Sequence, residues 1–167
     1  YDTTRKVSLN MMIEHTKSAR MGVKKSLLVI DLPYNTYRNK SEALKNSKKA
    51  IKETKCDAVK VEGGTKVKEI VKHLVKNRIP VLGHIGITPQ TTKGKFISKG
   101  KNEAEKRKLF KDAKDLEQSG AFGIVLECIY SDVSKKITNL INIPTIGIGA
   151  SVNCDGQVLV TDDLIGL

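Results

Sequence analysis

The sequence predicts a parallel α/β fold, and three observations support it. Short apolar runs, rich in β-branched residues and apolar on both faces, are typical of strands buried in a parallel sheet. Helical stretches lie between the runs, and right-handed crossovers join such elements into an open doubly wound sheet or a (β/α)8 barrel. No G-x-G-x-x-G or P-loop motif follows any run, which disfavours a nucleotide-binding open sheet.

The predicted elements alternate along the chain. The strands are the runs 27–30, 58–61, 81–83, 124–126 and 145–148. The first helix has an apolar stripe and ends at Gly22, because glycine is frequent just beyond the last helical turn. Its stripe is formed by Leu9, Met12, Ile13, Thr16 and Ala19. The second helix is expected to begin near Ser41, a residue type that caps helix N-termini well.

The remaining helices follow the later strands. The apolar positions of the third helix are Val67, Ile70, Val71 and Leu74, and those of the fifth are Val133, Ile137 and Leu140. The fourth begins at Asn102 and Glu105, which have capping-box-like spacing, and ends at Gly120. The polar segment 88–101 lacks periodicity and is predicted to be a long loop, of the kind that often forms an active-site lid.

Composition narrows the function classes. The 167 residues suffice for one domain with a core but not for a complete large barrel. The net charge of +12 comes from lysines scattered over solvated helix faces, and the absence of Trp argues against a stacking platform, so no nucleic-acid partner is expected. No apolar run is long enough to cross a membrane, so no membrane partner is expected. Three cysteines without a C-x-x-C pair suit a reducing cytosol, and a cytoplasmic location is predicted.

Titratable residues or glycines stand at the carboxyl end of every predicted strand. In chain order they are Asp31, Lys60 with Glu62, His84, Glu127, and Gly147 with Gly149. In a barrel these ends form the catalytic face. Structural alternatives remain open: Asp31 could cap a turn, Lys60 and Glu62 could form an ion pair, and His84 could bond to backbone in the core.

These residue types suit carbanion chemistry on a small 2-oxo acid. Asp31 and Glu62 are hard oxygen donors that suit Mg²⁺, which would polarise the oxo group and stabilise an enolate. Lys60 could neutralise the substrate carboxylate, and His84 could orient that carboxylate or polarise an oxygen. Glu127 follows a buried strand, which favours a raised pKa and the role of general base at C3. The residues alone therefore indicate a metal-assisted enolising enzyme.

Longer motifs surround these residues. They are LVIDLPY (28–34), AVKVEGG (58–64), PVLGHIGITPQ (80–90), VLEC (125–128), IPTIGIGA (143–150) and CDGQVLV (154–160). In order and spacing they resemble the ketopantoate hydroxymethyltransferase family, and the runs 83–90 and 155–160 are the most specific.

The resemblance implies a (β/α)8 TIM barrel of the phosphoenolpyruvate/pyruvate superfamily and a homo-oligomer, usually a decamer. It implies transfer of a hydroxymethyl group from methylenetetrahydrofolate to 3-methyl-2-oxobutanoate, which gives 2-dehydropantoate for pantothenate and coenzyme A biosynthesis. Mg²⁺ is the implied metal, with Asp31 and Glu62 as its ligands. Asp31, Lys60 and His84 take substrate-binding positions, and Glu127 takes the position of the catalytic base.

The resemblance also implies that residues 1–167 form a single partial barrel domain. Residues 1–4 resemble the end of the family's Gly-Tyr-Asp-Ser-Thr segment. The first two strands, an Asp-Ser motif that supplies another metal ligand, and the C-terminal tail are therefore expected to be missing. An inactive remnant of the enzyme and a basic nucleic-acid-binding module remain as alternatives.

Overall fold

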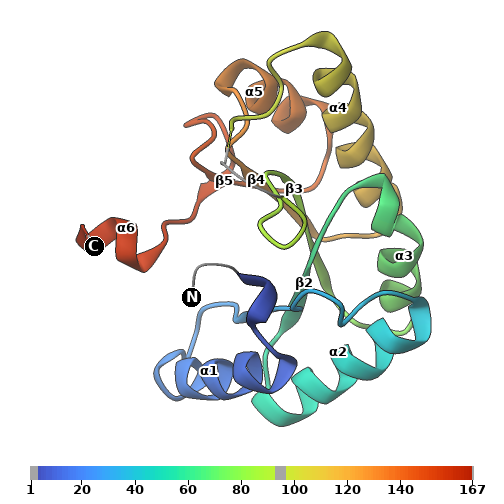
Figure 1. Cartoon of the computed structure of the whole chain (residues 1–167), viewed down its shortest axis with the longest axis vertical. Helices are drawn as coiled ribbons and strands as arrows, with labels where there is room; N and C mark the ends of the chain where they lie inside the picture. Colours follow the sequence, from blue (N-terminus) through green and yellow to red (C-terminus); the bar gives the residue numbers. More distant parts are fainter. Residues whose placement is uncertain (1–3, 93–96, 167) are drawn as a thin grey trace.

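A parallel sheet curls into an open half-barrel, and helices cover its outer, convex side (Figure 1). This computed structural model describes residues 4–92 and 97–166. The expectations for residues 1–3 and for the centre of the 88–101 loop lie outside the described residues. The first and last described elements, Thr4–Lys6 and Thr161–Ile165, lie on the open side of the half-barrel (Figure 1).

Within the described residues, six strands pair in strict chain order, each parallel to the one before. They are β1 (Val29–Asp31), β2 (Ala58–Glu62), β3 (Val81–Gly86), β4 (Gly123–Glu127), β5 (Thr145–Ile148) and β6 (Gly156–Gln157). The five predicted strands are confirmed. β3 continues two residues beyond His84, because Gly86 still pairs with Glu127 of β4. β6 was not predicted, since two residues carry no periodic signal.

The five predicted helices are present in the described residues. They are α1 (Leu9–Gly22), α2 (Lys40–Thr54), α3 (Lys68–Lys76), α4 (Glu103–Gln118) and α5 (Ser131–Leu140). The described residues also contain three short elements that the sequence did not predict: the 3₁₀ turns η1 (Thr4–Lys6) and η2 (Thr65–Val67) and the helix α6 (Thr161–Ile165). Helix α6 projects away from the half-barrel (Figure 1). None of the helices in the described part of the chain is long and apolar enough to cross a membrane.

The helix caps test the predicted boundaries. The predicted cap at Ser41 is wrong: Asn39 has the extended backbone of an N-cap, and its side chain accepts from the Glu42 N–H at 2.9 Å. Asn102 caps α4 as predicted, accepting from the Glu105 N–H at 2.9 Å. The Glu105 carboxylate accepts from the backbone amides of Gly100 and Lys101, and so ties the end of the long loop to α4.

The apolar core lies between the sheet and the helices. Along β2, Val59 and Val61 are fully buried and belong to this core, together with Val71 and Leu74 of α3. Because side chains alternate between the two faces of a strand, Lys60 lies on the opposite, inner face. The same alternation in the neighbouring strands gives the half-barrel a polar inner wall near the carboxyl ends of its strands.

Candidate functional site

The register of the sheet brings the predicted residues to one face. Asp31 pairs with Lys60, Glu62 with His84, and Gly86 with Glu127, so all five predicted side chains start from the inner face near the carboxyl ends. All five line one pocket of about 280 Å³. Further lining residues come from α1, the end of β5, and the loops and terminal segments: Thr4, Val7, Met12, Pro33, Pro89, Gln90, Ile148 and Val160.

Asp31 and Lys60 form an ion pair at the first strand of this wall. Lys60 Nζ lies 2.7 Å from Asp31 Oδ2, and the Asp31 side chain is 43% exposed. An ion pair between Lys60 and Glu62 was one predicted alternative. The structure instead pairs Lys60 with Asp31 on the adjacent strand β1. This arrangement places a positive and a negative group side by side at the rim of the pocket.

Glu62 is a buried carboxylate, with a side chain only 5% exposed. Its Oε2 accepts from the Gln90 N–H at 3.0 Å. Burial raises the pKa of Glu62, while the nearby His84 and the Gln90 N–H oppose that shift. A cation beside such a group favours its ionised form, so Glu62 is suited to hold one.

His84 lies between two carboxylates. Its Nδ1 is 3.9 Å from Glu62 Oε1, and its Nε2 is 3.1 Å from Glu127 Oε2. The ring is 1% exposed, yet neither nitrogen has a hydrogen bond of acceptable geometry within the described residues. Buried polar atoms without partners are uncommon, and here they face a pocket that could hold a polar ligand.

The donor set fits the implied Mg²⁺. Asp31 and Glu62 supply two carboxylates in one pocket. Within residues 4–92 and 97–166, no group of three or more His, Cys, Asp or Glu side chains is arranged to hold a metal. Mg²⁺ commonly uses one or two carboxylates and takes its other ligands from water and substrate, so two are compatible with this ion.

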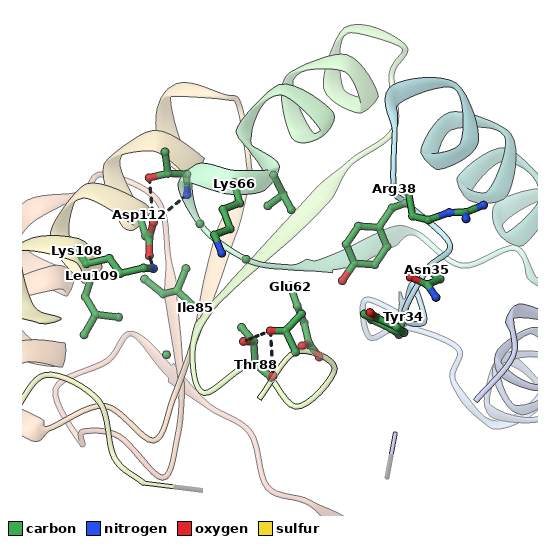
Figure 2. A pocket seen from close by; sticks show the side chains of 17 residues that line it. Tyr34, Asn35, Arg38, Glu62, Lys66, Ile85, Thr88, Lys108, Leu109 and Asp112 are labelled. Atoms are coloured by element: carbon green, nitrogen blue, oxygen red, sulfur yellow. Dashed lines mark hydrogen bonds and ion pairs between the residues drawn. The ribbon is translucent and has the colours of Figure 1, made fainter. Parts of the chain in front are cut away.

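A larger cavity has a volume of about 660 Å³ and is shown in Figure 2. Glu62 lines both cavities. Tyr34, Asn35 and Arg38 reach the larger cavity from the loop before α2, while Lys108 and Asp112 reach it from α4 (Figure 2). The sequence did not predict this cavity, because its walls come mainly from loops and one helix face without a recognisable spacing.

Asp112 is a buried residue that the sequence did not single out. Its Oδ1 accepts from both the backbone N–H and the hydroxyl of Thr65, each at 2.9 Å, and its Oδ2 contacts Lys108 (Figure 2). The carboxyl group packs against Gly64, where a Cβ would lie 2.1 Å from Asp112 Cγ. α4 thereby fixes the turn that immediately follows Glu62.

Comparisons with known proteins show which family the chain resembles. The family model described as ketopantoate hydroxymethyltransferase matches residues 1–167. The chain is 62% identical over 167 residues to the 3-methyl-2-oxobutanoate hydroxymethyltransferase of Pelagibacter ubique (strain HTCC1062), covering 100% of this chain and 65% of that protein. It is 46% identical over 165 residues to the protein of the same name from Aliarcobacter butzleri (strain RM4018), covering 98% of this chain and 61% of the relative. The chain thus spans less than two thirds of the length of these relatives.

Two solved structures share the fold. A putative phosphonomutase from Burkholderia cenocepacia J2315 has a TM-score of 0.61 at 10% identity, over 84% of this chain and 62% of that chain. A putative lyase/mutase from the same organism has a TM-score of 0.60 at 12% identity, over 96% of this chain and 59% of that chain. The predicted fold class is confirmed in its architecture: the described residues form an incomplete parallel α/β barrel.

Proposed function

The chain belongs to the ketopantoate hydroxymethyltransferase family, and we propose that it carries most of the active site of an enzyme acting on 3-methyl-2-oxobutanoate. The enzyme transfers a hydroxymethyl group from methylenetetrahydrofolate to this acid and gives 2-dehydropantoate, in pantothenate and coenzyme A biosynthesis. The observation that carries the proposal is the convergence of Asp31, Lys60, Glu62, His84 and Glu127 on one pocket.

Asp31 and Glu62 are the proposed ligands of Mg²⁺. When bound, the ion supplies Lewis-acid polarisation of the substrate's oxo group. Glu62 holds its orientation through the Gln90 N–H. Asp31 is more exposed and is placed by Lys60. The Lys60 ammonium group also lines the pocket and is the proposed partner of the carboxylate of the oxo acid.

Glu127 is the proposed general base. A carboxylate oxygen of Glu127 takes the proton from C3 of the acid, and the electron pair of that C–H bond becomes available to form the new carbon–carbon bond. His84 lies 3.1 Å from Glu127 and has unpaired ring nitrogens, so it can donate a hydrogen bond to the substrate or restrain the base. Its burial between strands keeps its ring in a fixed position.

We further propose that residues 1–167 form one partial barrel domain, that the enzyme is a cytoplasmic homo-oligomer, and that small molecules rather than nucleic acids are its partners. The inactive remnant remains the alternative function.

The test compares the 167-residue chain with a version extended upstream through an Asp-Ser motif, taken from the Pelagibacter ubique relative if necessary. Formation of 2-dehydropantoate from both substrates is measured with and without Mg²⁺. The extended protein is expected to turn over in a Mg²⁺-dependent way, and the chain alone to show little turnover, because open sheet edges leave the site accessible to water. A folded, extended protein without turnover would support the remnant instead.

A further inference from the structure

Gln90 occupies a central place beside the proposed metal ligands. It lies in the turn after β3, is only 5% exposed, and lines the pocket of about 280 Å³. No role was assigned to it from the sequence, although it ends the motif 80–90. A buried amide needs several hydrogen-bond partners, and here they include Glu62 and the backbone next to Asp31.

Three hydrogen bonds join Gln90 to the ends of β1 and β2 and to the loop that carries Tyr37. Its backbone N–H donates to Glu62 Oε2 at 3.0 Å. Its side-chain Nε2 donates to the carbonyl oxygen of Leu32 at 2.8 Å, and its Oε1 accepts from the Tyr37 hydroxyl at 2.7 Å. Leu32 directly follows Asp31, so a single residue contacts the Glu62 carboxylate and the backbone next to Asp31.

The orientation of the Gln90 amide is fixed by chemistry. The Leu32 carbonyl can only accept a hydrogen bond, so it requires the NH₂ end of the amide. The Tyr37 hydroxyl then donates to the oxygen end, and burial raises the pKa of Tyr37, which keeps that proton in place. If the amide rotated by half a turn, its NH₂ group would face the Tyr37 hydroxyl and its oxygen would face the Leu32 carbonyl oxygen. The bridge therefore has one favourable arrangement.

The turn that contains Gln90 does not need the Gln90 side chain. The N–H groups of Thr91 and Thr92 both donate to the Thr88 carbonyl at 2.9 Å, and the hydroxyls of Thr88 and Thr91 lie 2.7 Å apart (Figure 2). These bonds close the turn locally. The Gln90 side chain is thus free to connect the turn to β1 and to the loop that carries Tyr37.

We propose that Gln90 is a positioning residue that sets the separation and orientation of Asp31 and Glu62 toward the metal ion and the oxo acid. This role rests on the proposed function, since it assumes that those two carboxylates bind Mg²⁺. Tyr37 acts through Gln90 by holding its amide. Partners of metal ligands of this kind typically change metal affinity or activity about 10–100-fold when they are removed.

The experiment uses Gln90→Met, which keeps the side-chain length but removes both side-chain hydrogen bonds, and Tyr37→Phe, which removes only the hydroxyl. Thr91→Val is the matched control, because it removes a hydroxyl bond within the same turn without touching the bridge. Titration calorimetry measures the Kd for Mg²⁺ of each full-length protein, and thermal melting measures its stability. Steady-state kinetics then gives kcat and the KM for 3-methyl-2-oxobutanoate.

Gln90→Met is expected to weaken Mg²⁺ binding about 10–100-fold, with excess Mg²⁺ restoring most of kcat. Tyr37→Phe should shift the Kd in the same direction by less, and Thr91→Val should leave it within about twofold. A folded Gln90→Met protein with unchanged Kd for Mg²⁺ and unchanged KM would overturn the role. If Gln90→Met fails to fold, an unchanged Kd in the Tyr37→Phe protein would overturn it. If the unmodified protein binds Mg²⁺ but does not turn over, the proposed reaction is overturned, and the Kd values still decide the role of Gln90. If the unmodified protein does not bind Mg²⁺, the proposed reaction and the role of Gln90 are both overturned.

Discussion

His84 Nε2 lies 3.1 Å from Glu127 Oε2, yet the imidazole N–H is not aligned for a hydrogen bond to that oxygen. The carboxylate is close enough to be restrained by the ring and remains free to accept a proton from elsewhere. Glu127, the proposed base, could therefore take a proton from a bound acid without first breaking a hydrogen bond to His84.

Replacing Glu127 with Gln is expected to slow exchange of the C3 proton of 3-methyl-2-oxobutanoate with deuterated water. A general base typically contributes about 10²–10⁴-fold, so a loss of that size is expected. Proton NMR of the acid, incubated with the full-length protein and Mg²⁺, measures the exchange. Glu69→Gln, an exposed change on α3, is the control. Exchange at the unmodified rate in the Glu127 variant would remove it from the role of base.

Replacing Lys60 with Met is expected to raise the KM for the oxo acid, because its ammonium is the proposed partner of the substrate carboxylate. A hydrogen bond to a charged group contributes about 1.5–3 kcal/mol, which corresponds to about 10–150-fold in KM. Lys66→Met removes a cation that lines the other cavity. If Lys66→Met raises this KM and Lys60→Met does not, the oxo acid binds in the larger cavity instead.

Replacing Gly64 with Ala is expected to lower the free energy of unfolding. The new Cβ would lie 2.1 Å from Asp112 Cγ, so the buried carboxylate or the turn after Glu62 must move. Overpacking of this kind costs about 1–3 kcal/mol. Gly22→Ala is the matched control, since a Cβ there meets no atom within 4 Å. Urea unfolding measures both variants, and equal stabilities would contradict the close contact.

Asp155 gives a prediction for pH dependence. The backbone N–H and hydroxyl of Thr145 donate to its carboxylate at 2.8 and 2.9 Å, and they hold the pKa of Asp155 below its ordinary value of 3.8. A lowered folded-state pKa contributes stability above the unfolded-state pKa, and this contribution is lost as the pH falls through the folded-state pKa. Asp155→Asn should therefore lose less stability than the unmodified protein between about pH 5 and pH 3.

The control for this experiment is Asp163→Asn, which makes the same charge change at an exposed position of α6. Unfolding free energies are measured for all three proteins across the acidic range. If the two variants have parallel profiles, the bonds from Thr145 do not stabilise the ionised form of Asp155.

Much of the fold could be predicted because buried parallel strands are apolar on both faces and therefore stand out in the sequence. β6 could not be predicted, since it exists only by pairing Gly156 and Gln157 with β5. The start of α2 was misplaced because Asn39 and Ser41 are both good caps, and backbone geometry chooses between them.

The site residues that could be predicted are those at the carboxyl ends of strands, where topology alone brings them together. Gln90 and Asp112 could not be predicted in this way. Gln90 contacts a residue 58 positions away, and Asp112 contacts one 47 positions away, so neither has a local signal. Bound Mg²⁺, the folate co-substrate, the oligomer, the cytoplasmic location and the absence of a nucleic-acid partner remain predictions.

Because the strands pair in chain order, each can join the sheet against the strand synthesised immediately before it. Short loops lose less entropy on closure than long ones, and chains rich in local pairings fold faster. Since domains generally begin to fold from the N-terminal side during synthesis, β1 and β2 can associate before β4 has left the ribosome. Asp31 and Glu62, the proposed metal ligands, would then be in place before Glu127, the proposed base, has been synthesised.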